Sequence, residues 1–92
     1  MKIQAKIIVK GTVQGVFFRQ FVKEAADSLE LVGFVRNLES GDVEIIVEGS
    51  DERIDRFVEV VRKGPPHAII KDVVVEERKW GGDFKDFRVL RF

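Results

Sequence analysis

The sequence has no cysteine, a single histidine and no long run of apolar residues. Without cysteine there can be no disulfide and no thiolate metal site, and His67 alone cannot form a histidine cluster around a metal. No apolar stretch approaches the roughly 20 residues that cross a bilayer, and lysines interrupt the apolar residues of the first segment, unlike a signal peptide. We therefore expect no metal site, no membrane partner and a cytoplasmic location.

An excess of one charge is also missing. The chain has 16 Lys and Arg against 16 Asp and Glu, a formal net charge of zero. Nucleic-acid and membrane-surface binders draw affinity from excess positive charge, so this balance argues against a nucleic-acid partner. Asn37 is the only asparagine, and charged residues make up 35% of the chain. Because ion-pair networks gain value at high temperature while amide side chains degrade, this composition favours a thermophilic source over an ordinary small charged domain.

What the chain does contain is a series of short apolar patterns in one domain, residues 1–92, without repeats or a linker. A hydrophobic content of 45% supports a modest core. Alternation of apolar and polar residues predicts strands, and apolar residues spaced three and four apart predict helices. The predicted strands are 3–10, 34–38, 43–48, 69–79 and 84–90, and the predicted helices are 18–29 and 51–63.

Two local features refine these elements. Ser50 is suited to be the N-cap of the second helix, because Asp51 and Glu52 follow in the first turn, and Gly64 is suited to end that helix. In the 69–79 strand the apolar residues change phase, which predicts a bulge near Lys71–Asp72.

The order of the elements is β-α-β-β-α-β with a short extra strand, which predicts an α+β fold. The simplest compact arrangement is one antiparallel sheet of four to five strands with both helices on one face. In this split βαβ arrangement the third strand lies between the first and the second, which point the same way. The C-terminal ends of the first two strands then lie at one edge of the sheet, about 10 Å apart.

The segment from Gly11 to Arg19 joins the first strand to the first helix. A cation at a helix N-terminus opposes the positive end of the helix dipole unless an anion lies between them. Gly11 and Gly15 allow a tight turn, and the free backbone N–H groups from Gly15 to Arg19 can bind a phosphate. The predicted topology brings Asn37, at the end of the second strand, to the mouth of this loop.

Taken singly, these residues have ordinary explanations. The loop can be a plain turn from a strand to a helix. Arg19 can be a solvated surface residue, and Asn37 can simply form a turn. Only their convergence favours a functional site. We expect the neighbouring aromatic residues to pack in the core and loops rather than to form a stacking platform: Phe17, Phe18, Phe21 and Phe34.

Longer motifs resemble those of a known family. The first motif of the acylphosphatases is similar to residues 11–19, GTVQGVFFR. The second is similar to residues 33–37, GFVRN, with Gly41, Val43 and Gly49 following at the family's spacing. A further stretch typical of the family resembles residues 64–68, GPPHA. Two long motifs in the right order are far more specific than one glycine pattern.

The resemblance implies a ferredoxin-like α/β sandwich that hydrolyses the carboxyl-phosphate bond of acyl phosphates to a carboxylate and inorganic phosphate. It implies no metal, no cofactor and no covalent enzyme intermediate, a small-molecule acyl phosphate as the partner, and a monomer. The catalytic arginine corresponds to Arg19 and the catalytic asparagine to Asn37. The phosphate-binding loop corresponds to Gln14, Gly15, Val16, Phe17, Phe18 and Arg19.

One residue departs from the family pattern. Glu30 stands where the family often has a glycine, at the end of the first helix. Glycine suits the left-handed conformation that commonly ends a helix. We therefore expect either strain at Glu30 or a different helix end.

The residue types fit the implied reaction. A carboxylate departs without a proton, so no general acid is needed, and what remains is charge stabilisation on the phosphoryl oxygens and an aligned water. Arg19 can clamp two oxygens, and Asn37 can orient a water but cannot deprotonate it. We expect the proton to pass to a phosphate oxygen of the substrate, which a basic limb from an enzyme base in the pH–rate profile would contradict.

Three alternatives stay open. The same loop could bind anions without turnover. An RNA-binding ferredoxin-like module would present aromatic residues on the open face of the sheet, where we instead expect Gln4, Lys6, Glu44 and Glu48. The chain could also be a piece of a larger maturation enzyme that begins with such a domain, but it ends at Phe92 without zinc-finger spacing, which favours a free-standing enzyme.

Overall fold

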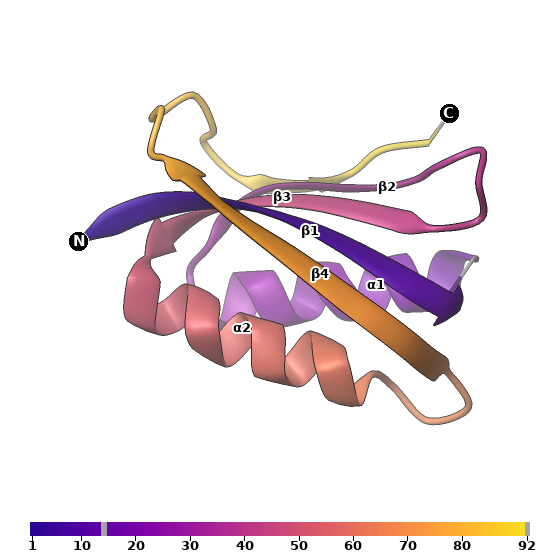
Figure 1. Ribbon diagram of the computed structural model, residues 1–92. Helices are drawn as coiled ribbons and strands as arrows, with labels where there is room; N and C mark the ends of the chain where they lie inside the picture. Colours follow the sequence, from indigo (N-terminus) through magenta and orange to yellow (C-terminus); the bar gives the residue numbers. More distant parts are fainter. Residues whose placement is uncertain (14, 92) are drawn as a thin grey trace.

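The computed structural model describes residues 1–13 and 15–91 and has two layers, a five-stranded sheet and a pair of helices on one of its faces (Figure 1). The strands are β1 (Lys2–Thr12), β2 (Val32–Asn37), β3 (Val43–Ser50), β4 (Ile69–Lys79) and β5 (Phe87–Val89). The helices are α1 (Val16–Ser28) and α2 (Asp51–Lys63). The predicted α+β fold with both helices on one face is confirmed. Among the described residues, no helix has the length and apolar composition needed to cross a membrane.

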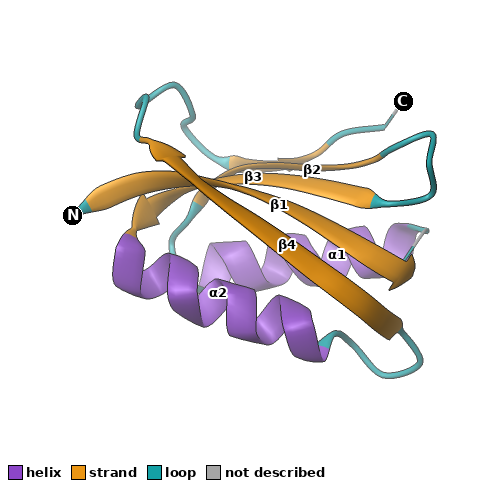
Figure 2. Cartoon of the chain, in the orientation of Figure 1, coloured by secondary structure: helices purple, strands orange, loops and turns teal. Residues whose placement is uncertain are grey.

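The strand order is β4-β1-β3-β2-β5, so β3 lies between β1 and β2, as predicted. Both of these strands pair antiparallel with β3 and therefore point the same way. The sheet is nevertheless mixed, because β5 pairs parallel with β2, and β5 is shorter than the predicted strand 84–90. Since β4 ends at the edge where β2 begins, the loop that follows crosses this edge and continues in the direction of β2 (Figure 2).

One core fills the space between the two layers. Along β1 every second residue is buried, with at most 8% of its surface exposed: Ile3, Ala5, Ile7 and Val9. The helices bury the apolar faces that their spacing predicted, Phe18, Val22 and Ala26 from α1 and Ile54, Phe57 and Val61 from α2. Burial of these faces holds α1 against the sheet and so positions its N-terminus.

The bulge predicted in β4 is present. Lys10 pairs with Asp72 but Gly11 pairs with Ile70, so Lys71 is the extra residue. Gly11 has a φ of 137°, and a Cβ atom on it would lie 2.0 Å from a backbone carbonyl oxygen of β4. Gly11 therefore permits the close approach of β1 and β4 at the bulge. Its role in the turn before α1, which we expected from the sequence, belongs to Gly15 instead.

The face of the sheet without helices carries several polar side chains, together with Ile8 and Ile46. Gln4, Lys6, Glu44 and Glu48 lie on it, as their register shows. Glu44 is 8% exposed and binds Nε of Arg36 at 2.7 Å and Nζ of Lys6 at 3.8 Å. Arg36 is thus an ion-paired residue of this face.

The strands of this face contain few aromatic residues. The central strand β3 and its neighbour β1 contain none. On β2, the other neighbour of β3, Phe34 packs against Phe84, with ring centroids 6.0 Å apart. RNA-binding modules of this fold class use exposed aromatic residues and a basic surface.

Candidate active site

The C-terminal ends of β1 and β2 lie at one edge of the sheet, beside the start of α1 (Figure 1). Asn37 ends β2 and pairs with Val43 of β3, which in turn pairs with Val9 of β1. Because neighbouring strands are about 4.8 Å apart, Asn37 lies about 10 Å across the sheet from Val9. Val9 and Val43 are buried against the helices, so Asn37, directly opposite, faces the helical layer as well.

Among the described residues, no side chain caps the N-terminus of α1. Its N-cap residue is Gly15, and its first turn contains no acidic residue. The first four N–H groups of a helix have no partner within the helix, and the helix dipole makes this end positive. The local chemistry therefore suits an oxyanion.

Gly15 is required here by its backbone conformation. Its φ of 114° and ψ of 167° fall in a region that is essentially restricted to glycine. A Cβ atom added to Gly15 would meet no atom within 4 Å. The space beside the amides of the first turn is thus open to a ligand.

Arg19 lies one turn into α1, and its guanidinium is directed by two backbone oxygens. Nε donates to Gly15 O at 3.4 Å, and Nη1 donates to Leu90 O at 3.3 Å. Leu90 N in turn donates to Val35 O at 2.9 Å, which ties the guanidinium to β2 close to Asn37. Within residues 1–13 and 15–91, Arg19 has no carboxylate partner, so its charge is not compensated.

The side-chain oxygen of Asn37 does not take part in the hydrogen bonds of the turn that follows β2. The turn after β2 is closed by the backbone, since Leu38 N donates to Asp42 O at 2.8 Å and Gly41 N donates to Leu38 O at 3.1 Å. Asn37 Oδ1 is buried and accepts no hydrogen bond from any described residue. Buried polar atoms are normally paired. The turn-forming explanation for Asn37 therefore loses its support.

The predicted phosphate loop forms the N-cap and first turn of α1, with Gly15 before Val16 and Arg19 at its end. Gln14, the first residue of this predicted loop, lies outside the described residues. Phe18 packs in the core at 4% exposure, but Phe17 is 87% exposed. The expectation that Phe17 packs is wrong, because successive helical residues are about 100° apart and Phe17 points away from the apolar stripe.

Leu90 was not expected at the site. Its backbone carbonyl, rather than its side chain, holds Arg19. Any residue could supply that carbonyl, so no side-chain pattern signals it. Only the position of the chain after β5, beside β2, brings it there.

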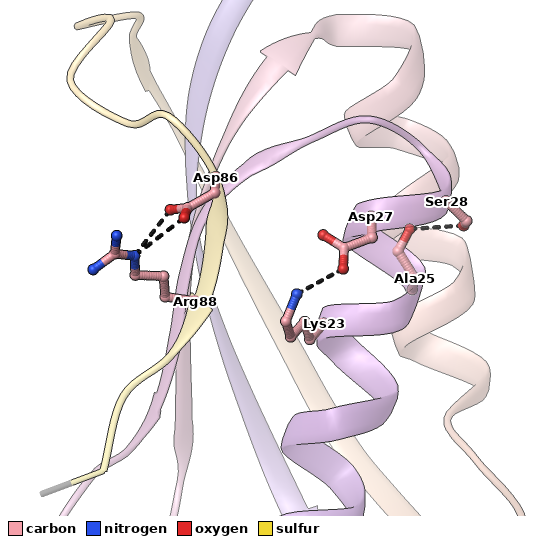
Figure 3. Close-up of polar contacts among 6 residues, drawn as sticks. All are labelled: Lys23, Ala25, Asp27, Ser28, Asp86 and Arg88. Atoms are coloured by element: carbon pink, nitrogen blue, oxygen red, sulfur yellow. Dashed lines mark hydrogen bonds and ion pairs between the residues drawn. The ribbon is translucent and has the colours of Figure 1, made fainter.

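A hollow of about 650 Å³ between α1 and β5 also holds basic side chains. Two of them are paired with acids, Lys23 with Asp27 at 2.7 Å and Arg88 with Asp86 at 3.0 Å (Figure 3). Each pair compensates one positive charge of the hollow, which Lys85 and Arg91 also line. Among the described residues, no group of three or more His, Cys, Asp or Glu is arranged to hold a metal ion.

The chain is similar to known proteins over nearly its whole length. A family model described as Acylphosphatase matches residues 5–89. A curated relative from Caldivirga maquilingensis, named Acylphosphatase, is 42% identical over 88 residues, which is 95% of this chain and 93% of that protein. The crystal structure of acylphosphatase from Bacillus subtilis superimposes with a TM-score of 0.92 at 39% identity and covers 97% of this chain and 99% of that one.

The same fold also occurs within a much longer protein. The crystal structure of T. kodakarensis HypF matches with a TM-score of 0.83 at 36% identity, over 98% of this chain but only 12% of that one. The resemblance inferred from residues 11–19 and 33–37 is therefore confirmed by sequence and by structure. The chain belongs to the acylphosphatase family.

Proposed function

We propose that this protein hydrolyses acyl phosphates to a carboxylate and inorganic phosphate at the N-terminus of α1. One observation carries the proposal. Among the described residues, the N-terminus of α1 has no side-chain cap, Arg19 has no carboxylate partner and Asn37 Oδ1 has no hydrogen bond, and all three lie at the same end of the sheet. Membership of the acylphosphatase family supports it.

The phosphoryl group binds to the free backbone amides at the start of α1, residues 15–18, and to the guanidinium of Arg19. Backbone amides hold their positions without reorganisation, which makes them effective at stabilising charge as it develops. The present contacts of Arg19 are long, at 3.3 and 3.4 Å, so a doubly charged phosphoryl group competes for them readily.

Hydrolysis needs one displacement at phosphorus. The oxygen of a water forms a bond to phosphorus while the bond from phosphorus to the acyl oxygen breaks, and that electron pair leaves with the carboxylate. The dianionic substrate and water thus give a carboxylate and dihydrogen phosphate. Asn37 orients the water, because its amide can both donate and accept.

No residue in this group acts as a base near neutral pH. An asparagine amide has no ionisable group, and an arginine guanidinium offers hydrogen-bond donors only. The water proton passes to a phosphate oxygen of the substrate. We expect kcat to show no basic limb that an Asp, Glu or His of the enzyme would produce, and such a limb would overturn this step.

The test is hydrolysis of benzoyl phosphate and acetyl phosphate by the purified chain. Arg19→Ala should lower kcat/KM by about 100- to 1,000-fold, the value of one lost donor to a transition-state oxyanion. Asn37→Ala should lower kcat more than it raises KM, since it acts on the water. Arg88→Ala is the matched control, because Arg88 is an exposed arginine that is already paired with Asp86.

An inactive wild-type protein would overturn the enzymatic proposal. If inorganic phosphate still raised the melting temperature of such a protein, the loop would be an anion-binding site without turnover. These two measurements separate catalysis from binding.

We further propose that the protein acts as a monomer in the cytoplasm, without a nucleic-acid or membrane partner. Arg19, Asn37 and the carbonyl of Leu90 all come from one chain, so a single copy supplies the site. Light scattering should give a mass of 10.5 kDa at all concentrations. A mass that doubles at assay concentrations would contradict the monomer.

A further inference from the structure

We infer that the acyl group of the substrate binds in an apolar pocket beside the phosphate loop, and that this pocket selects aromatic or branched apolar acyl groups over small or anionic ones. The inference rests on the proposed hydrolysis of acyl phosphates and adds the class of acyl group to it.

The pocket lies between the first turns of α1 and the loop that joins α2 to β4. Its volume is about 600 Å³, and pockets for small molecules typically enclose about 300–1,000 Å³. Rings and prolines form most of its wall: Phe17, Phe21, Pro65, Pro66 and His67. An apolar acyl group would gain free energy as its surface leaves water and would contact these rings.

The pocket adjoins the proposed phosphate loop and shares Phe17 and Phe18 with it. Phe17 and Phe18 contribute their backbone to the first turn of α1 and their side chains to the pocket wall, and Thr12 at the end of β1 also lines it. A phosphoryl group held by these amides therefore has the pocket as its neighbour. Only one bridging oxygen separates the acyl group from the phosphoryl group, so the acyl group would lie beside the pocket wall.

Phe17 is the residue that this arrangement explains best. Its ring is 87% exposed, although a phenylalanine normally gains by burial. On the other wall, His67 has a φ of 73°, which is unusual for a residue other than glycine, and such backbone strain concentrates at ligand sites. A bound acyl group would cover both side chains.

The position of the pocket also agrees with the direction of the reaction. In-line displacement puts the attacking water and the leaving group on opposite sides of phosphorus. In the sheet, β4 lies on one side of β1 and β2 on the other. The pocket adjoins the start of β4, whereas Asn37 ends β2, so the water and the acyl group approach from the two sides.

Charge sets the second part of the selectivity. Glu24 lines the pocket and is the one acidic side chain among its described lining residues. No lysine or arginine is among them. An acyl group that carries its own carboxylate or phosphate would meet an acid with no compensating cation, and apolar groups are therefore preferred.

The experiment compares kcat/KM for benzoyl phosphate, acetyl phosphate and succinyl phosphate. Wild type should prefer the benzoyl over the acetyl compound, and succinyl phosphate should be the poorest of the three. Phe17→Ala should lower the benzoyl-to-acetyl ratio about five- to tenfold, the value of one aromatic contact. His67→Gly, which suits the positive φ, should lower the ratio in the same direction from the opposite wall.

Trp80→Ala is the matched control. Trp80 is 44% exposed and follows β4, at the opposite end of the sheet from the pocket. Its removal should leave the ratio unchanged. The inference would be overturned if both Phe17→Ala and His67→Gly left the benzoyl-to-acetyl ratio unchanged, including by lowering kcat/KM equally for the two substrates. The proposed hydrolysis would still stand. If wild type hydrolysed none of the three, the proposed function itself would fail.

Inhibition supplies a readout without turnover. Benzylphosphonate and methylphosphonate carry the same anionic group but differ in the ring. Wild type should bind benzylphosphonate more tightly, and Phe17→Ala should narrow that difference by the same five- to tenfold, about the value of one aromatic contact. Equal inhibition of wild type by the two phosphonates would also overturn the inference.

Discussion

The two helices of this protein lie side by side beneath the same sheet and have 13 residues each, yet their ends are built differently (Figure 1). At the start of α2, Ser50 Oγ accepts a hydrogen bond from Arg53 N at 3.3 Å, and Asp51 and Glu52 complement the helix dipole. The start of α1 has glycine, no acid and an arginine. The ends of α2 are stabilised by its own residues, whereas we propose that the first amides of α1 bind a ligand.

The C-terminal ends repeat this contrast. α2 has Arg62 and Lys63 in its last turn and then Gly64, with a φ of 68°. α1 has no basic residue in its last turn, and Glu30 takes up the left-handed conformation with a φ of 57°. α1, the helix of the proposed site, thus lacks the terminal residues that stabilise α2, and we propose that the difference at its N-terminus serves phosphate binding.

The largest effect should come from removing the freedom of the backbone at the start of α1. Gly15→Ala should cost about 1–3 kcal/mol of stability, because the native φ and ψ suit only glycine. It should also lower kcat/KM by more than about 100-fold, since the amides of the first turn would no longer converge on phosphate. Stopped-flow assays and chemical denaturation measure the two effects.

Gly41→Ala is the control for this change. Gly41 has a φ of 95° and the same open surroundings, but it lies in the turn between β2 and β3. It should lose comparable stability and keep its activity per folded molecule. If both variants lost activity equally, the loss would reflect strain in general rather than the start of α1.

Inorganic phosphate should stabilise the protein through α1 alone. At 100 times its Kd, phosphate should add about 2.7 kcal/mol, and each kcal/mol should raise Tm by about 4–8 °C in a domain of this size. Arg19→Ala should abolish most of this shift, whereas Ser50→Ala should retain it in full. Thermal melts with and without phosphate provide the measurement, and an equal shift in Arg19→Ala would place the phosphate elsewhere.

Removing the cap of α2 should have the complementary result. Ser50→Ala should lower the free energy of unfolding by about 1 kcal/mol, because Arg53 N loses its acceptor. Activity at 25 °C should stay the same. Ser28→Ala, which removes a hydroxyl that bonds Ala25 O at 2.9 Å near the end of α1, should cost less. A loss of activity in Ser50→Ala would contradict the conclusion that the N-terminus of α2 contributes to stability alone.

The smallest effect should come from placing glycine at position 30, at the C-terminal end of α1. Leu31 N donates to Ala26 O at 2.9 Å and Glu30 N donates to Asp27 O at 3.1 Å, the pattern of a helix end that normally has glycine at position 30. Glu30→Gly should raise stability by up to about 1 kcal/mol. The exposed pair with Arg53, at 3.6 Å, offsets little of that.

Glu30→Ala separates the two contributions at this helix end. It loses the ion pair but keeps the left-handed strain, so it should not stabilise the protein. The denaturation midpoints of wild type, Glu30→Gly and Glu30→Ala measure the two contributions. Equal stability of the glycine and alanine variants would show that the strain at position 30 is negligible.

Much of this fold could be predicted from local patterns. Alternation in β1 and the apolar stripes of the helices follow directly from which residues gain by burial. The extra residue at Lys71 shows in the shifted phase of β4, and the cap at Ser50 shows in its residue type. These features depend on neighbours in the chain, so the sequence alone carries them.

Features that depend on distant partners were predicted less well. The parallel direction of β5 follows from where β4 ends, and the pairing of Arg36 with Glu44 follows from register across the sheet. Phe17 was expected to pack, because four apolar or aromatic residues near one helix start look alike in sequence. Its direction depends on the phase of α1 against the sheet.

The sequence by itself determined the elements, their order and the family, because periodicity and the motifs at residues 11–19 and 33–37 are local properties. It also named Arg19 and Asn37 as the proposed pair. Only the tertiary structure decided that Arg19 is held by the carbonyl of Leu90 and that the exposed ring of Phe17 borders a pocket. A backbone carbonyl is the same in every residue, and exposure depends on what the rest of the chain covers, so neither can be read from residue types.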